Sequence, residues 1–169
     1  RGRFLAENIT NTSLMRITTG RDHTCSVKED GTVRCWGANN AGQLGDGTII
    51  DRPSPVVVGI INIVAVTSGF FHTCALQADG NVWCWGNRAG VGGPFGSGSQ
   101  RTPVLVGVKN VVSVAAAANY TCVLIGDGSV NCWGVFPGFN GYASVPTLVA
   151  GISNRRSGRE VGRRPLRSL

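Results

Sequence analysis

Long hydrophobic runs are absent from this sequence of 169 residues. No stretch reaches the ~18 consecutive apolar residues that a membrane-spanning helix requires, so we expect no membrane span. Charged residues are also few, at 15%, whereas glycine is frequent, with 25 residues. This composition fits short strands joined by many tight turns, and the length is enough for one core of ordinary size.

Histidine is scarce, because His23 and His72 are the only two. Both occupy the same position of a repeated segment, and a residue repeated in this way is more often structural, bonding a neighbouring turn, than catalytic. The carboxylates of Asp30, Asp79 and Asp127 belong to Asp-Gly turns. No set of nucleophile, base and acid stands out. The sequence therefore predicts a protein that is not an enzyme and needs no cofactor.

The net charge of +7 is unevenly distributed along the chain. Residues 1–154 hold ten Lys or Arg and eight Asp or Glu, whereas residues 155–169 hold six Arg and one Glu. Nucleic-acid binding by the repeats thus has little electrostatic support. We expect residues 155–169 to form a disordered tail; the alternative is that this arginine-rich tail contacts nucleic acid or an anionic membrane.

The most informative feature is a segment that occurs three times. Residues 72–86 read His-Thr-Cys-Ala-Leu-Gln-Ala-Asp-Gly-Asn-Val-Trp-Cys-Trp-Gly, and residues 23–37 and 120–134 are similar. The first cysteines of the copies, Cys25, Cys74 and Cys122, are spaced 49 and 48 residues apart. A fixed period in this range is typical of solenoids, propellers and other repeat arrays.

Each copy is predicted to form a β-hairpin, because Asp-Gly between alternating apolar residues is a strong hairpin signal. A three-residue loop with Gly31 in the left-handed conformation places Cys25 opposite Cys35. The pair then falls on a non-hydrogen-bonded position, where Cα atoms approach to about 4.5 Å, and disulfides span about 4.4–6.8 Å. The same count in all copies predicts three disulfides: Cys25–Cys35, Cys74–Cys84 and Cys122–Cys132.

A zinc site is the alternative for these cysteines. Two of the three copies carry a histidine two residues before the first cysteine, so each could supply three ligands. The Cys-x9-Cys spacing is unlike that of usual zinc sites, however, and the third copy has Tyr120 in place of the histidine. We therefore favour disulfides and expect no metal.

Each hairpin is flanked by two further predicted strands and a glycine-rich loop. A first strand precedes the hairpin (14–19, 63–68 and 111–116), and a last strand begins at a proline (55–58, 103–106 and 146–149). The loop of residues 38–48 is not a phosphate-binding P-loop, because no Gly-Lys-Ser/Thr follows. In the second copy, the loop of residues 87–99 lacks the Gln-Leu-Gly of the first. About four strands in ~49 residues make one propeller blade.

We accordingly divide the chain into an N-terminal segment (1–13), three repeats (14–59, 60–107 and 108–154) and the tail (155–169). Alternation puts cysteines on one face of each sheet and tryptophans on the other. A sheet that is apolar on both faces must be covered on both sides, as a propeller blade is by its neighbours.

The repeat resembles the regulator-of-chromosome-condensation repeat family. The matching motif is Gly-x-x-His-Thr-Cys-x-Leu-x-x-Asp-Gly-x-Val-x-Cys-Trp-Gly-x-Asn-x-x-Gly-Gln-Leu-Gly, fullest in the first copy. The resemblance implies an all-β fold, a β-propeller usually of seven four-stranded blades. Three repeats cannot close such a ring, so we expect a partial propeller of about three blades, from a fragment or a chain that another chain completes.

The resemblance implies two functions. Nuclear members of the family act as guanine-nucleotide exchange factors for a small GTPase, in a reducing compartment where disulfides are rare. The cysteine-paired variant resembles secreted or surface proteins. We predict a non-enzymatic scaffold, secreted, periplasmic or at the cell surface, that binds another protein and no small-molecule substrate. The alternative is an exchange factor in the cytoplasm or nucleus, with reduced cysteines.

Propeller loops vary in sequence while the strands keep the same structure, so partner recognition is expected on the loops. The best candidate is the divergent aromatic segment 134–142, followed by residues 88–100. The candidate binding residues are Arg88, Phe95, Phe136, Phe139 and Tyr142. An alternative for Phe136 and Phe139 is that they fill a gap left by the shorter third loop.

Overall fold

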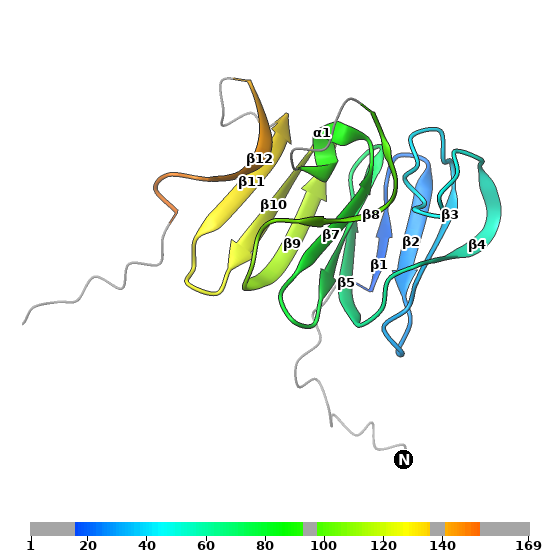
Figure 1. The fold of residues 1–169 in the computed structure, drawn as a ribbon, viewed down its shortest axis with the longest axis horizontal. Coiled ribbons are helices and arrows are strands. Elements are labelled where there is room, and N and C mark those ends of the chain that lie inside the picture. Colours follow the sequence, from blue (N-terminus) through cyan, green and yellow to red (C-terminus); the bar gives the residue numbers. More distant parts are fainter. Residues whose placement is uncertain (1–15, 93–97, 136–140, 153–169) are drawn as a thin grey trace, which may run out of the picture.

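Three antiparallel four-stranded sheets lie side by side in the computed structural model, which describes residues 16–92, 98–135 and 141–152 (Figure 1). The first sheet contains β1 (Ile17–Thr19), β2 (His23–Val27), β3 (Val33–Gly37) and β4 (Arg52–Val58). The second contains β5 (Ile63–Ser68), β6 (His72–Gln77), β7 (Val82–Gly86) and β8 (Gln100–Val106). The third contains β9 (Val111–Ala117), β10 (Tyr120–Ile125), β11 (Val130–Val135) and β12 (Tyr142–Leu148).

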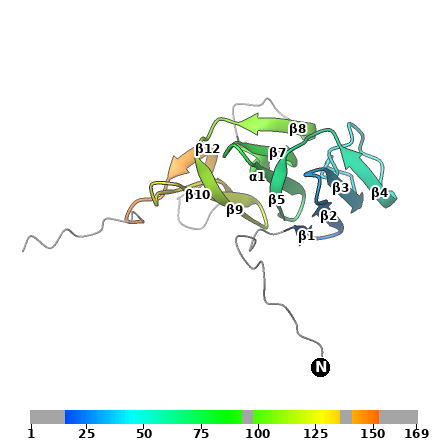
Figure 2. The ribbon, with the colours of Figure 1, turned by 90° about the horizontal axis from the view of Figure 1, so that it is seen from below.

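In every sheet the strands pair in chain order, which is the meander of a propeller blade. Figure 2 shows the three blades seen from below, as a partial and unclosed propeller. The predictions for residues 1–13 and 155–169 concern residues outside the described part. No helix of the described residues is long and apolar enough to cross a membrane.

The predicted hairpin register is confirmed in all three blades. Each first cysteine lies opposite the second in the ladder, and the Cα atoms of each disulfide pair are 4.1 Å apart. Gly31 adopts a positive φ of 76°, which closes the three-residue turn. Because all six cysteines form disulfides, they are not zinc ligands.

The carboxylates of the Asp-Gly turns hold the turns closed. Asp30 Oδ1 accepts hydrogen bonds from the backbone and the hydroxyl of Thr32, and these bonds lower the pKa of Asp30. Ser129 contacts Asp127 through its backbone amide in the same way, and bonds from its hydroxyl and amide lower the pKa of Asp127. These aspartates therefore have a structural role.

The last strands begin before the prolines, not at them as predicted. β4 starts at Arg52 and β8 at Gln100, and Tyr142 opens β12. In each blade the pairing of the third strand with the fourth has a register shift. In the first blade this shift lies between the partners of Cys35 and Gly37. The prolines fall in or beside these irregularities on the outer strand, where a missing N–H costs no ladder bond.

Apolar side chains fill the two spaces between blades, as the two-faced pattern predicted. The cysteine face of one blade contacts the tryptophan face of the next. Between the first and second blades the core includes Cys25, Val27, Val33, Cys35, Val66, Ala75 and Trp85. Between the second and third it includes Cys74, Leu76, Val82, Cys84, Val114, Val123 and Trp133.

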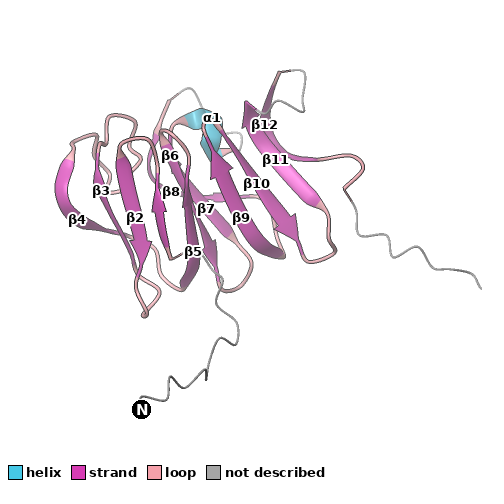
Figure 3. Ribbon diagram, turned by 180° about the vertical axis from the view of Figure 1, so that it is seen from behind, coloured by secondary structure: helices cyan, strands magenta, loops and turns pink. Residues whose placement is uncertain are grey.

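One short helix, α1 (Arg88–Val91), replaces the expected irregular loop after β7 (Figure 3). The side chain of Asn87 accepts a hydrogen bond from the Ala89 amide and caps it. The end of this helix takes the place of the Gln-Leu-Gly motif that the second copy lacks, because Gly90-Val91-Gly92 lies where Gln43-Leu44-Gly45 lies in the first blade. Leu44 and Val91 are both buried, and Gly45 and Gly92 both have a positive φ and lie against a tryptophan of the next blade.

The disulfides predict a definite mass. Unreduced, denatured protein should be six hydrogen atoms lighter than the reduced chain and should take up no alkylating reagent, because all six cysteines are paired. Intact-mass spectrometry with and without reduction measures both. Uptake of reagent at any cysteine before reduction would contradict the pairing.

Candidate functional site

The two histidines join neighbouring blades. His23 and His72 are almost fully buried, with exposed fractions of 3% and 1%. His23 Nε2 lies 2.9 Å from Thr73 Oγ1 of the second blade, and His72 Nε2 lies 2.9 Å from Thr121 Oγ1 of the third. The structural role is the one expected, but the partner is a strand threonine of the next blade and not a turn.

Each of these threonines also bonds to a loop of the preceding blade. The Thr73 hydroxyl donates to the carbonyl oxygen of Gln43 (2.9 Å), which also accepts the indole N–H of Trp85 (2.8 Å). Gly90 accepts equivalent bonds from Thr121 (2.9 Å) and Trp133 (2.8 Å). We call each set of histidine, threonine, loop carbonyl and tryptophan a blade-joining network.

Burial favours the neutral form of both histidines in these networks. A threonine hydroxyl has one proton, which it donates to the carbonyl, so the histidine Nε2 has to be the donor toward Thr Oγ1. Burial lowers the pKa of His23 to about 4 and that of His72 to about 3. For His23 the nearby Asp22 opposes this shift, and for His72 the charge of His23 adds to it.

The lowered pKa values predict that the fold loses stability in mild acid. Between pH 6.5 and about 4 the unfolded chain binds protons on these histidines and the folded chain does not, so the free energy of unfolding falls as the pH falls. The loss from pH 7 to pH 4.5 should be about 2 kcal/mol for each histidine. Urea unfolding at the two pH values measures it, and equal midpoints would contradict the buried neutral state.

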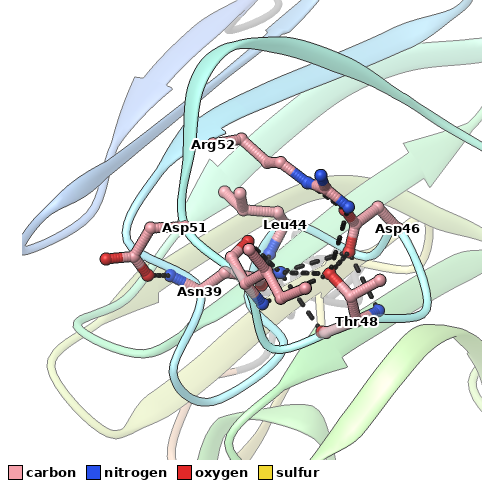
Figure 4. A network of polar contacts seen from close by, with 7 residues as sticks. Asn39, Leu44, Asp46, Thr48, Asp51 and Arg52 are labelled. Carbon is pink, nitrogen blue, oxygen red and sulfur yellow. Dashed lines mark hydrogen bonds and ion pairs between the residues drawn. The ribbon is translucent and has the colours of Figure 1, made fainter.

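The loop of residues 38–51 is held rigid by a polar network around Asn39 (Figure 4). The fully buried Asn39 side chain donates to Asp46 Oδ1 and to the carbonyl oxygens of Thr48 and Ile50, and it accepts from the Leu44 amide. Asp46 Oδ2 also lies 2.7 Å from Arg52 Nε. Although burial opposes the shift, bonds from Thr48, Arg52 and Asn39 lower the pKa of Asp46. This loop therefore presents the Gln43 carbonyl in a fixed position.

The turns and loops at one end of the blades form what we call the loop face: residues 20–22, 38–51, 69–71, 87–92, 117–119 and 141–142. Backbone bonds tie its parts together within each blade, since the amides of Ala38, Asn87 and Val135 donate to the carbonyl oxygens of Asp22, Phe71 and Asn119. The Asp-Gly turns lie at the opposite end. In Figure 1 the loop face is at the top, with α1.

Two of the five predicted binding residues come together on the loop face. Arg88 on α1 and Tyr142 at the start of β12 line one open hollow of about 270 Å³, with Asn87 and Ala89. Both side chains are exposed, and Arg88 makes no ion pair with any described residue. The other three candidates, Phe95, Phe136 and Phe139, lie outside the described residues, so their predicted roles stay predictions.

The sequence interpretation missed the threonine of the His-Thr-Cys motif. It recurs in all three copies directly after the histidine, or after Tyr120 in the third. Thr73 and Thr121 are fully buried and central to the blade-joining networks. A polar residue repeated on a strand between two core positions was the signal that could have found it.

A sequence profile of the regulator of chromosome condensation (RCC1) repeat matches residues 16–43 and 63–87. The third blade, the most divergent copy, is not part of that match. Human WBSCR16 superposes on 80% of this chain and 37% of its own, with a TM-score of 0.73 and 25% sequence identity.

Two yeast structures show the same architecture. Prp20p from Saccharomyces cerevisiae, described together with its binding to Gsp1p and histones, matches 83% of this chain and 38% of its own (TM-score 0.68, 22% identity). Yeast RCC1 (Prp20) bound to Kap60 matches 83% and 37% (TM-score 0.70, 22% identity). The chain thus spans less than two fifths of the length of these proteins. The first and second blades thus carry repeats of the regulator of chromosome condensation family, and the three-bladed fold is similar to part of these propellers.

Proposed function

We propose that the chain is a non-enzymatic scaffold that binds another protein through its loop face. The observation that carries this proposal is the hollow lined by Arg88 and Tyr142, on the same face as the loop of residues 38–51 that the Asn39 network fixes. Arginine and tyrosine are enriched among the residues that dominate protein–protein binding energy. Because the loop of residues 38–51 is already fixed by this network, little conformational entropy is lost there when a partner binds.

The histidines support the non-enzymatic part of the proposal. A general acid or base must reach the substrate and have a pKa near the working pH. His23 and His72 are buried between blades, and their pKa values lie at about 4 and about 3. Their hydrogen bonds to Thr73 and Thr121 account for both of them without catalysis.

Relatives of this fold bind proteins. The yeast structures concern binding to Gsp1p, histones and Kap60, and this supports a protein as the partner of the present chain. The disulfides favour an oxidising compartment, such as the exterior or the periplasm, since they are rare in the cytosol and nucleus. We therefore place the partner among secreted or surface proteins.

Exchange-factor activity toward a small GTPase is the second candidate, and family analogy alone favours it. It requires a reducing compartment, where the three disulfides would not persist. A nucleotide-release assay on the reduced protein, with a small GTPase, separates the two candidates.

The proposal predicts the effect of removing the two anchors. The double variant Arg88→Ala/Tyr142→Ala should lose at least tenfold in affinity for a captured extracellular partner, because anchor residues typically contribute 1 kcal/mol or more each. Its melting temperature should stay within about 2 °C, since both side chains are exposed. Affinity capture followed by titration of the identified partner measures the loss.

A matched control variant is Val57→Ala/Leu105→Ala, which also truncates two exposed side chains but on the outer strands β4 and β8. It should bind the partner as the unchanged protein does. If the control weakens binding and the loop-face variant does not, the partner binds the outer strands β4 and β8, and the assignment of the binding site to the loop face is wrong.

A further inference from the structure

In the turn between the first and second strands of each blade, two residues separate a small residue (Gly20, Gly69 or Ala117) from the histidine or tyrosine that begins the second strand. Gly20 and Gly69 must stay small, because an added Cβ would lie within about 2.1 Å of the histidine ring of the same turn. The second residue of each pair supplies the carbonyl that accepts the loop amide. The first residue of each pair is Arg21, Phe70 or Ala118. Its side chain takes part in neither of these two contacts.

These three side chains line one cleft of the loop face, together with Thr19, Ser68 and Ala117. The cleft lies where the first strands of the three blades, β1, β5 and β9, reach the loop face. Its volume is about 160 Å³, which is about five times the volume share of one water molecule. It is therefore large enough for a side chain and too small for a folded ligand.

Arg21 brings a charge that the chain itself hardly neutralises. Its Nε lies 3.5 Å from Asp22 Oδ2, with side chains 60% and 63% exposed, and such pairs contribute little. Its guanidinium carbon lies 5.6 Å from the centre of the Phe71 ring, which orients the group. The donor fork of an arginine matches the two oxygens of a carboxylate.

Ser68 and Phe70 add two further preferences. The Ser68 hydroxyl is buried and has no hydrogen-bond partner among the described residues, which is costly unless an entering group supplies one. Phe70 is 47% exposed and offers an apolar surface beside it. Because Ala118 has a small side chain, an entering group can approach the third blade closely at this position.

We propose that this cleft binds an acidic side chain of the partner protein, with an apolar side chain next to it in the partner. The carboxylate pairs with Arg21 and, once the buried Ser68 side chain rotates toward the cleft, accepts from its hydroxyl, and the apolar neighbour lies on Phe70. This inference rests on the proposed function, because it names the chemistry that the loop face recognises. A basic partner segment is disfavoured by the charge of Arg21.

The test is a selection from a random linear peptide library on the unchanged, oxidised full chain. Enriched peptides should carry Asp or Glu next to an apolar residue. A synthetic copy of the best peptide should bind about tenfold more weakly to Arg21→Glu, and also when its own acidic residue is amidated. Ser68→Ala should weaken binding without lowering the melting temperature, because the hydroxyl has no partner to lose.

Arg101→Glu is the matched control, since it makes the same charge change at an exposed position of β8 that does not line the cleft. Binding should be nearly unchanged. Peptides without acidic residues, or equal losses for both arginine variants, would overturn the cleft while leaving protein binding by the loop face intact. Absence of any enriched peptide would also overturn the cleft proposal. The Arg88→Ala/Tyr142→Ala variant tests the proposed function independently of this result.

Discussion

One loop carbonyl joins each pair of blades, and the rest of the structure depends on it. The oxygens of Gln43 and Gly90 each accept a threonine hydroxyl and a tryptophan indole from the following blade. A buried carbonyl left without donors is costly, and one with two partners fixes the loop and the sheet relative to each other. The buried histidine completes the set, because it supplies the donor that the threonine oxygen still needs.

This arrangement separates stability from recognition. The hairpin disulfides, the core between blades and the blade-joining networks use the inner atoms of each repeat, and the Asn39 network fixes the first loop. The outward side chains of the loop face are then free to differ between repeats, as Arg21, Phe70 and Ala118 do. Rigid loops with variable side chains are what a binding scaffold requires.

The hairpins were predictable because one turn assumption put all three cysteine pairs into register, and local geometry decides that register. The equivalence of Gly90-Val91-Gly92 with Gln43-Leu44-Gly45 was not predictable, since two fewer residues separate it from the preceding Trp-Gly and the match is in backbone position, not in residue type. The role of Thr73 was also missed: the repeated polar residue between two core positions was a local signal, but its partners on the neighbouring blade leave no pattern in the sequence. For the site, the sequence placed Arg88 and Tyr142 on loops, but only the fold brings them to one hollow.

The most direct test of the blade-joining network compares two threonines at the same repeat position. Thr73 lies between two described blades, whereas Thr24, in the first blade, has no described blade beside it on that face. Urea unfolding of Thr73→Val and Thr24→Val measures the difference at constant side-chain shape. We predict a loss of about 2 kcal/mol for Thr73→Val, which leaves His23 without its partner, and less than about 0.5 kcal/mol for Thr24→Val. Equal losses would show that the network does not hold the blades together.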